Sequence, residues 1–89
     1  LTRALAMDHA TDGIRVNAVC PGEVRTPMLQ SQRSEPVTPA LLDHIAATVP
    51  MGRLAEPIEI ARVVAFLASD AASYMTGALV SVDAGYGAR

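Results

Sequence analysis

Apolar residues recur along this chain with two periods, one typical of strands and one typical of helices. From Ile14 to Cys20 every second residue is apolar, and Val19 adds an apolar side chain on the opposite face. This pattern predicts a strand that is covered on both faces. Pro21 lacks the N–H that a ladder hydrogen bond needs, and Gly22 permits turn conformations, so we expect the sheet to stop there. The chain then leaves the carboxyl edge of the sheet, where ligands collect in open α/β sheets.

Helical spacing begins at the first residue. The pattern predicts a helix from Leu1 to about His9 or Ala10, with Gly13 placed to end it in the left-handed conformation. No capping side chain and no proline precedes Leu1, so we expect the helix to be cut there rather than begun. We therefore expect these residues to be the tail of a longer chain.

Two further helices have clear start signals. Thr38 and Pro39 suit the cap and first position of a short helix that ends before Pro50, and Pro57 opens a longer helix that ends near residues 69–70. The shorter helix either closes over a substrate or packs on the domain, and the sequence does not separate these alternatives. The expected apolar faces are Leu41, Leu42, Ile45, Ala46 and Val49 in the shorter helix, and Ile60, Ala61, Val64, Leu67 and Ala68 in the longer one.

A polar loop from Glu23 to Thr38 separates the strand from the shorter helix, and prolines interrupt it. Its length favours a lid or binding loop, because it leaves the ligand-bearing edge directly. A disordered surface excursion is the alternative. The last apolar run, Ala78 to Val82, predicts a second strand that ends in the turn Asp83 to Gly85.

The order of these elements predicts an α/β fold. Two strands joined by helices are expected to be parallel, with the crossover helices on one face of the sheet. A two-stranded parallel sheet leaves an edge and much of a face uncovered. We therefore expect the isolated chain to need further strands or a partner to be stable.

Composition narrows the class of protein. Hydrophobic residues make up 51% of the 89 residues but aromatic residues only 3%, which predicts an aliphatic core. Seven basic and nine acidic residues give a net charge of -2 with no basic cluster, so nucleic acid is not an expected partner. The chain has no apolar run near the roughly 20 residues that span a bilayer and no charged-then-apolar leader. A single cysteine, Cys20, agrees with a reducing compartment, and we expect a soluble intracellular protein.

Other residues of chemical interest receive structural interpretations. Neither His9 nor His44 has other metal-ligating residues at ligand spacing, so a metal site is not expected. Arg53 is interpreted as a solvated or helix-capping side chain rather than a phosphate ligand. Tyr74 is interpreted as a packing or interface residue rather than a general acid. Glu59 is expected in the first turn of the longer helix, where it can pair with Arg62 on the solvent side.

Several blocks, in this order and at this spacing, closely resemble the C-terminal third of the short-chain dehydrogenase/reductase family. The resemblance implies the last two strands of a Rossmann-type doubly wound parallel sheet, with the end of the helix that precedes them. Residues 1–89 would be the C-terminal part of a single NAD(P)-binding domain, with a substrate lobe at about residues 27–49. The blocks are Asn17–Thr26, Pro50–Arg53, Glu56–Ala61, Phe66–Asp70, Thr76–Gly77 and Val82–Asp83.

The resemblance also implies roles for particular residues. Pro21 and Gly22 match the turn that brings the backbone close to the nicotinamide of NAD or NADP. Val24 matches the residue whose main chain meets the carboxamide, and Thr26 the hydroxyl that bonds the cofactor near its nicotinamide end or pyrophosphate. Many relatives have a second glycine at Ala84, a difference for which the sequence shows no consequence.

The family's proton-transferring Tyr-x-x-x-Lys pair, its serine and its glycine-rich phosphate loop are not among these residues, and the chain contains no lysine. The resemblance implies a cytoplasmic oxidoreductase that moves a hydride between an alcohol and a ketone and assembles as a homodimer or homotetramer. We expect this chain to be the C-terminal segment of such an enzyme, and to be inactive alone. A truncated, non-catalytic assembly or binding module is the alternative.

Overall fold

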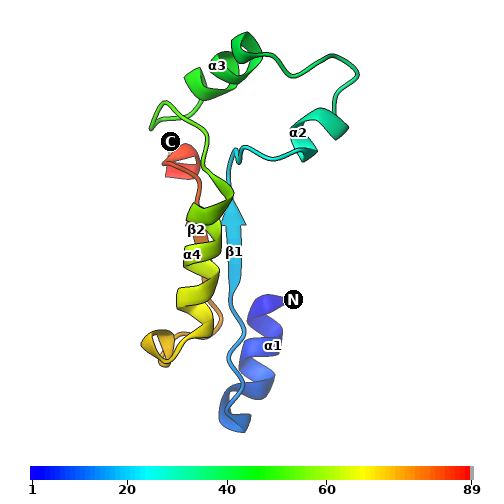
Figure 1. The fold of residues 1–89 in the computed structure, drawn as a ribbon. Helices are drawn as coiled ribbons and strands as arrows, with labels where there is room; N and C mark the ends of the chain where they lie inside the picture. Colours follow the sequence, from blue (N-terminus) through cyan, green and yellow to red (C-terminus); the bar gives the residue numbers. More distant parts are fainter. Residues whose placement is uncertain (89) are drawn as a thin grey trace.

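The computed structural model describes residues 1–88, and Arg89, which closes the expected domain 1–89, lies outside the described residues. The described part is elongated, with extents of 50 × 24 × 22 Å (Figure 1). No helix within it is both long and apolar enough to cross a lipid bilayer. The helices are α1 (Thr2–His9), α2 (Met28–Ser31), α3 (Pro39–Ala47) and α4 (Pro57–Ala68), the 3₁₀ turns are η1 (Ala10–Asp12), η2 (Asp70–Ala72) and η3 (Tyr86–Ala88), and the strands are β1 (Ala18–Pro21) and β2 (Leu79–Val82).

The two strands pair in parallel, as expected, in a register that runs from Ala18 beside Leu79 to Pro21 beside Val82. Ala18 N–H donates to the carbonyl of residue 78 at 2.9 Å, and Gly22 N–H donates to Val82 O at 3.1 Å. Alternate residues of a strand point their N–H groups the same way, so the nitrogen of Pro21 faces away from β2. Pro21 is therefore the last residue of β1, and the sheet ends at the Pro21–Gly22 turn, as predicted.

β1 begins at Ala18, not at Ile14 as the apolar alternation predicted. The preceding residues are held by irregular contacts instead of a regular ladder. The Asn17 side chain donates to Met75 O and accepts from the Ala78 N–H, both at 3.0 Å. The Asn17 side-chain amide thus replaces a backbone hydrogen-bond partner. The apolar alternation in the sequence does not reveal this, so it predicted too early a start for the strand.

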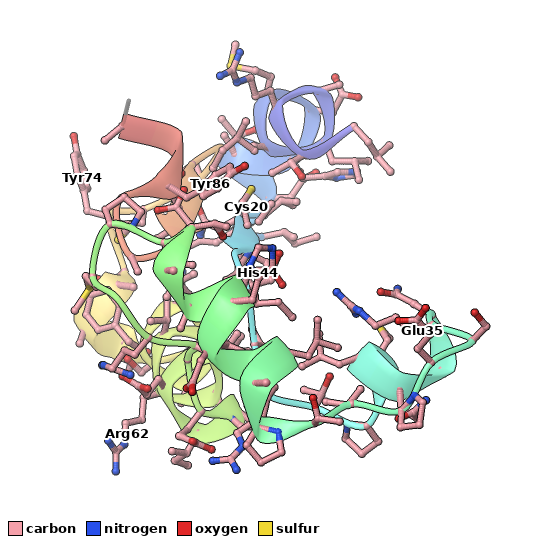
Figure 2. All side chains as sticks on the ribbon, turned by 90° about the horizontal axis from the view of Figure 1, so that it is seen from above. Cys20, Glu35, His44, Arg62, Tyr74 and Tyr86 are labelled. Carbon is pink, nitrogen blue, oxygen red and sulfur yellow. The ribbon has the colours of Figure 1, made fainter. Side chains whose placement is uncertain are left out.

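Helices α1 and α4 lie on opposite sides of the strand pair (Figures 1 and 2). α1 packs through Ala6, which is 3% exposed and contacts the Gly77 position before β2. α4 packs through its buried Leu67. α3 lies beyond the carboxyl ends of the strands, so of the helices of the crossover only α4 covers the sheet, not both as expected (Figure 1).

The predicted covering of both strand faces is wrong for residues 1–88. Ile14 and Leu79 are each 49% exposed, and Cys20 is exposed. The α4 face also differs, because Val64 is 49% exposed while Val63 is half-buried. Two helices cannot cover every face and edge of two apolar strands. The buried residues are few and mostly small: Ala6, Leu29, Ile45, Val49, Leu67 and Ala72.

The predicted helix boundaries are largely confirmed. Gly13 ends the first helical segment with φ of 74°. The Thr38 hydroxyl accepts a hydrogen bond from the Leu41 N–H at 3.2 Å, and Pro39 takes the first helical position of α3. α4 ends at Ala68 with Ser69 as its C-cap, close to the expected end at residues 69–70. The short helix α2 was not predicted, since the polar residues 23–38 have too few apolar positions to show helical spacing.

Candidate functional site

A cavity of about 730 Å³ opens beside the carboxyl ends of the strands. It brings together all four predicted cofactor-binding residues: Pro21, Gly22, Val24 and Thr26. Its other walls come from the segment after β1 and from α4, namely Glu23, Pro27, Met28, Leu29, Gln32, Pro57, Ile60, Ala61 and Val64. The cavity is therefore mostly apolar with a few polar groups, as small-molecule sites usually are.

Val24 pairs with Ala55 in an isolated parallel bridge just beyond the sheet. Ala55 N–H donates to Glu23 O at 2.9 Å, and Arg25 N–H donates to Ala55 O at 2.8 Å. Both bonds use the neighbours of Val24, so its own N–H and C=O face away from Ala55. Within residues 1–88 these two groups have no hydrogen-bond partner. Val24 thus presents an unpaired peptide edge where the cavity lies.

Thr26 is half-buried at the start of the segment that leads to α2. Its carbonyl accepts from the Leu29 N–H at 3.1 Å, which ties the residue to the first turn of that helix. No partner for its hydroxyl lies among the described residues. A short hydroxyl with free donor and acceptor capacity therefore lies at the cavity wall, two residues from the unpaired peptide edge.

The Pro21–Gly22 turn packs closely against Asp83, the residue that follows β2. A Cβ at Gly22 would lie 2.9 Å from Asp83 Cα, so only glycine allows this approach. The Asp83 carboxylate accepts hydrogen bonds from the N–H groups of Gly85 at 3.1 Å and Gly87 at 3.0 Å. Ala84, between Asp83 and Gly85, has φ of 56°, a conformation that costs energy for any residue with a Cβ.

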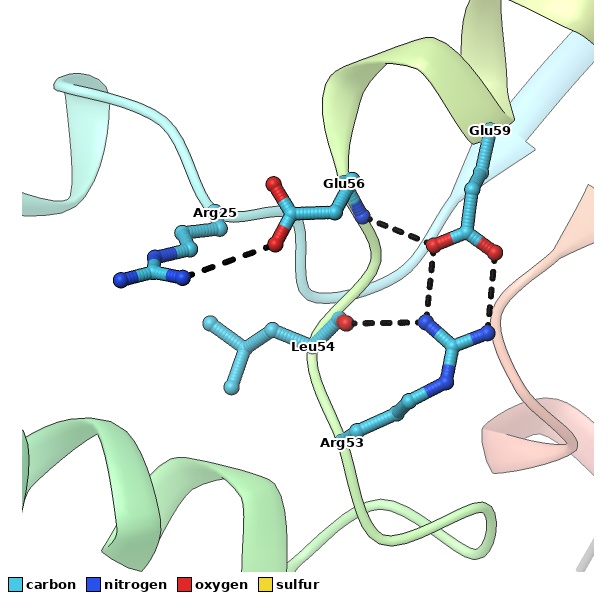
Figure 3. A network of polar contacts seen from close by, with 5 residues as sticks. All are labelled: Arg25, Arg53, Leu54, Glu56 and Glu59. Carbon is cyan, nitrogen blue, oxygen red and sulfur yellow. Dashed lines mark hydrogen bonds and ion pairs between the residues drawn. The ribbon is translucent and has the colours of Figure 1, made fainter.

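A polar network of Arg25, Arg53, Leu54, Glu56 and Glu59 lies at the start of α4 (Figure 3), next in sequence to both residues of the Val24–Ala55 bridge. Arg53 donates two hydrogen bonds to the Glu59 carboxylate, at 2.7 and 2.9 Å, and Glu56 N–H donates to Glu59 Oε1 at 3.0 Å. These bonds, first that of Arg53 and then that of Glu56, lower the pKa of Glu59 to about 2. The same pairing raises the pKa of Arg53. Arg25 adds an ion pair to Glu56 at 3.6 Å.

This network corrects one expectation and confirms another. The predicted Glu59–Arg62 pair is wrong, because the carboxylate turns back to cap its own helix, where Arg53 meets it. Arg53 is the solvated side chain of the two expected alternatives: it is 52% exposed, it pairs with the Glu59 carboxylate that caps the helix, and it does not line the cavity. Sequence reasoning missed the contribution of Ala55, whose methyl side chain has no polar group and which acts through its backbone alone.

The remaining candidates lie away from the cavity. His9 Nδ1 lies 3.0 Å from Asp12 Oδ2 at the amino-terminal end of β1, and no three His, Cys, Asp or Glu side chains of residues 1–88 are grouped to hold a metal ion. Tyr74 is fully exposed, so packing within the described chain is not its role (Figure 2). Arg15, which no motif indicated, donates to the carbonyls of Leu67, Ser69 and Met75.

Comparison with known sequences gives these features a context. A sequence profile described as enoyl-(acyl carrier protein) reductase matches residues 1–87. The solved structure of a short-chain dehydrogenase family protein from Francisella tularensis superposes with a TM-score of 0.87 and 37% identity, and the match covers 99% of this chain and 39% of the other. The chain belongs to the short-chain dehydrogenase/reductase family. A Thermus thermophilus protein superposes with a TM-score of 0.82 at 50% identity, with 99% and 36% of the two chains covered.

Curated relatives within this family match along most of the chain. Oxidoreductase UcpA of Escherichia coli K12 is 50% identical over 88 residues, which are 96% of this chain and 34% of that protein. Galactitol 2-dehydrogenase (L-tagatose-forming) of Cereibacter sphaeroides is 51% identical over 86 residues, 97% of this chain and 33% of that protein. The chain thus spans about a third of the length of these relatives. The matched part has the two-stranded parallel sheet of a Rossmann-type fragment.

Proposed function

We propose that this chain is the C-terminal segment of an NAD(P)(H)-dependent oxidoreductase that transfers a hydride between an alcohol and a ketone. The unpaired peptide edge of Val24 at the cavity carries the proposal. A peptide edge offers one donor and one acceptor, which is the complement of the carboxamide on a nicotinamide ring. Pairing with that amide would determine which face of the ring meets the substrate. Orientation of this kind is the protein's main contribution to cofactor chemistry.

The neighbouring residues supply the rest of this half-site. The bound nicotinamide supplies or accepts the hydride. The Pro21–Gly22 turn would let the backbone approach the ring, and the Thr26 hydroxyl would hydrogen-bond the cofactor near its nicotinamide end or pyrophosphate. Residues 27–49, here called the lobe, would close over the substrate on the far side of the cavity. Proton transfer then requires a Tyr-x-x-x-Lys pair in a preceding segment.

The wider biological setting is part of the same proposal. The cofactor is NAD or NADP, and the substrate is a small alcohol or ketone. Exposed apolar side chains on α4 and β2, such as Phe66 and Leu79, support pairing of subunits into a homodimer or homotetramer. The free, exposed thiol of Cys20 is in keeping with a cytoplasmic location.

Two experiments test the proposal. The coding sequence upstream of Leu1 is expected to encode an in-frame Tyr-x-x-x-Lys, whereas a stop codon there would favour the truncated binding module. In the full-length protein, Thr26→Ala is expected to weaken NADH or NADPH binding about tenfold, the value of one hydrogen bond, with a smaller change in substrate KM. Cofactor fluorescence measures the binding. Thr11→Ala, at an exposed position of η1, is the matched control. Unchanged cofactor affinity in Thr26→Ala would remove its assigned role.

A further inference from the structure

We infer that Arg53 and Glu59 are positioning residues that aim the Val24 peptide edge at the cofactor. Neither residue lines the cavity, so neither acts by touching a ligand there. They act through Ala55, the bridge partner of Val24. The inference rests on the proposed function, because it assigns the nicotinamide as the group that this edge meets.

The first peptide unit of the bridge is held at both ends. Its N–H, that of Ala55, donates to Glu23 O at 2.9 Å. Its carbonyl, that of Leu54, accepts from Arg53 Nη1 at 3.3 Å (Figure 3). The same nitrogen donates to Glu59 Oε1 at 2.7 Å, so the guanidinium joins this carbonyl to the first turn of α4. Rotation of the peptide would break a bond at each end.

The second peptide unit is held in the same way. Its carbonyl, that of Ala55, accepts from the Arg25 N–H at 2.8 Å. Its N–H, that of Glu56, donates to Glu59 Oε1 at 3.0 Å. One carboxylate oxygen thus accepts from both Arg53 and this N–H, and it fixes both peptides that flank the Ala55 Cα.

The orientation of the Ala55 peptides determines that of Val24, because the backbone of Ala55 bonds to the two residues that flank Val24, Glu23 and Arg25. Arg53 and Glu59 hold both peptides of Ala55, and these peptides in turn hold the Glu23 carbonyl and the Arg25 N–H. The Val24 N–H and C=O must then face away from Ala55. The Pro-Gly-Glu-Val-Arg-Thr block and the Gly-Arg-Leu-Ala-Glu-Pro-Ile-Glu block, some 30 residues apart in the chain, are therefore two parts of one orienting device.

The experiment compares two ligands of the full-length protein, NADH (or NADPH, whichever the wild type binds) and ADP-ribose (or its 2′-phosphate), which lacks the nicotinamide. The variants are Arg53→Ala and Glu59→Gln. Glutamine retains an oxygen that accepts the Glu56 N–H, so Glu59→Gln keeps the helix cap while it removes the ion pair. Arg62→Ala, at an exposed arginine of the same helix with no hydrogen bond to another described residue, is the matched control.

Both variants are expected to bind the reduced cofactor about tenfold more weakly and ADP-ribose unchanged, while Arg62→Ala binds both like wild type. Equal weakening for both ligands, or no weakening for either, would overturn the inference. If Arg53→Ala does not fold, Glu59→Gln decides the question alone. A wild type that binds neither ligand would instead refute the proposed function, so the two failures are distinct.

Discussion

Arg15 and Leu67 are 52 residues apart in sequence, and the Arg15 guanidinium donates to the Leu67 carbonyl at 2.8 Å. This carbonyl belongs to the last turn of α4, where the helix leaves its carbonyls without intrahelical partners. The same side chain donates to Ser69 O at 3.1 Å and Met75 O at 3.4 Å. One cation therefore ties the approach to β1 to the end of the crossover helix and to the connection before β2.

Arg15→Ala is expected to destabilise the full-length protein by about 1.5–3 kcal/mol, because part-buried helix-end carbonyls lose a charged donor. Chemical denaturation followed by circular dichroism measures the change. Arg62→Ala, which removes an exposed arginine, is the control and is expected to stay within about 0.5 kcal/mol of wild type. Equal effects of the two substitutions would show that the Arg15 contacts contribute nothing to stability.

Gly22→Ala is expected to destabilise the protein by about 1–3 kcal/mol, the usual cost of forcing an extra methyl group into a filled space. The added Cβ would lie 2.9 Å from the Asp83 backbone, which cannot rotate away as a side chain could. Thermal unfolding measures the loss. An alanine variant with wild-type stability would mean that the ends of β1 and β2 separate without cost.

Ala84→Gly is expected to stabilise the protein by about 0.5–1 kcal/mol. Glycine removes the strain of φ at 56°, and part of that gain is offset by the greater freedom of glycine in the unfolded chain. Ala65→Gly, at an exposed position within α4, is the opposing control and is expected to destabilise by about 1 kcal/mol. Destabilisation by both substitutions would contradict the strained conformation at Ala84.

The contribution of the Arg53–Glu59 pair to folding stability is expected to depend on pH. Because the pKa of Glu59 falls to about 2 on folding from an ordinary value of 4.5, its stabilising effect is complete above pH 4.5. The effect is lost as the pH falls from 4.5 to about 2. The difference in stability between wild type and Glu59→Gln should therefore shrink over this range and shrink with salt at neutral pH. A difference that stays constant from pH 7 to pH 3 would contradict it.

The isolated chain is expected to lack cooperative unfolding. Ile14 and Leu79 are half exposed, and a sheet of two strands is marginal in water. A broad thermal transition and poorly dispersed amide NMR signals are the expected observations for the purified monomer. A sharp transition with well-dispersed signals would show that residues 1–89 suffice for a stable fold.

Features that depend on local chemistry were predictable from sequence. Gly13 and Pro57 each mark a helix boundary through a conformational preference and Thr38 through a capping hydroxyl, and the structure has those boundaries. The parallel pairing followed from the order of the elements. Features that depend on contacts between distant segments were not predictable. Glu59 has two arginines within reach along the chain, and only the fold shows which one it meets.

The candidate site also has features that could be predicted from the sequence and features that depend on contacts between distant segments. The family resemblance implies that Pro21, Gly22, Val24 and Thr26 share one location, and they line one cavity. Which way the Val24 peptide faces depends on Ala55, far along the chain, whose type reveals nothing about its hydrogen bonds. Likewise the sequence shows no consequence of alanine at residue 84, because the φ angle there is visible only in the structure.

The bridge between Val24 and Ala55 has a consequence for how such proteins diversify. The chain leaves the sheet after Val24 and returns at Ala55, and these two residues are paired (Figure 1). The lobe, residues 27–49, is therefore a loop whose two ends are held together by this bridge. Insertions, deletions or replacement within residues 27–49 leave the strand register in place, and they keep Thr26, Arg53 and the Val24 peptide edge. Under the proposed function, residues 27–49 transplanted from a relative should therefore change substrate preference as a single module, while the proposed cofactor-binding residues stay the same.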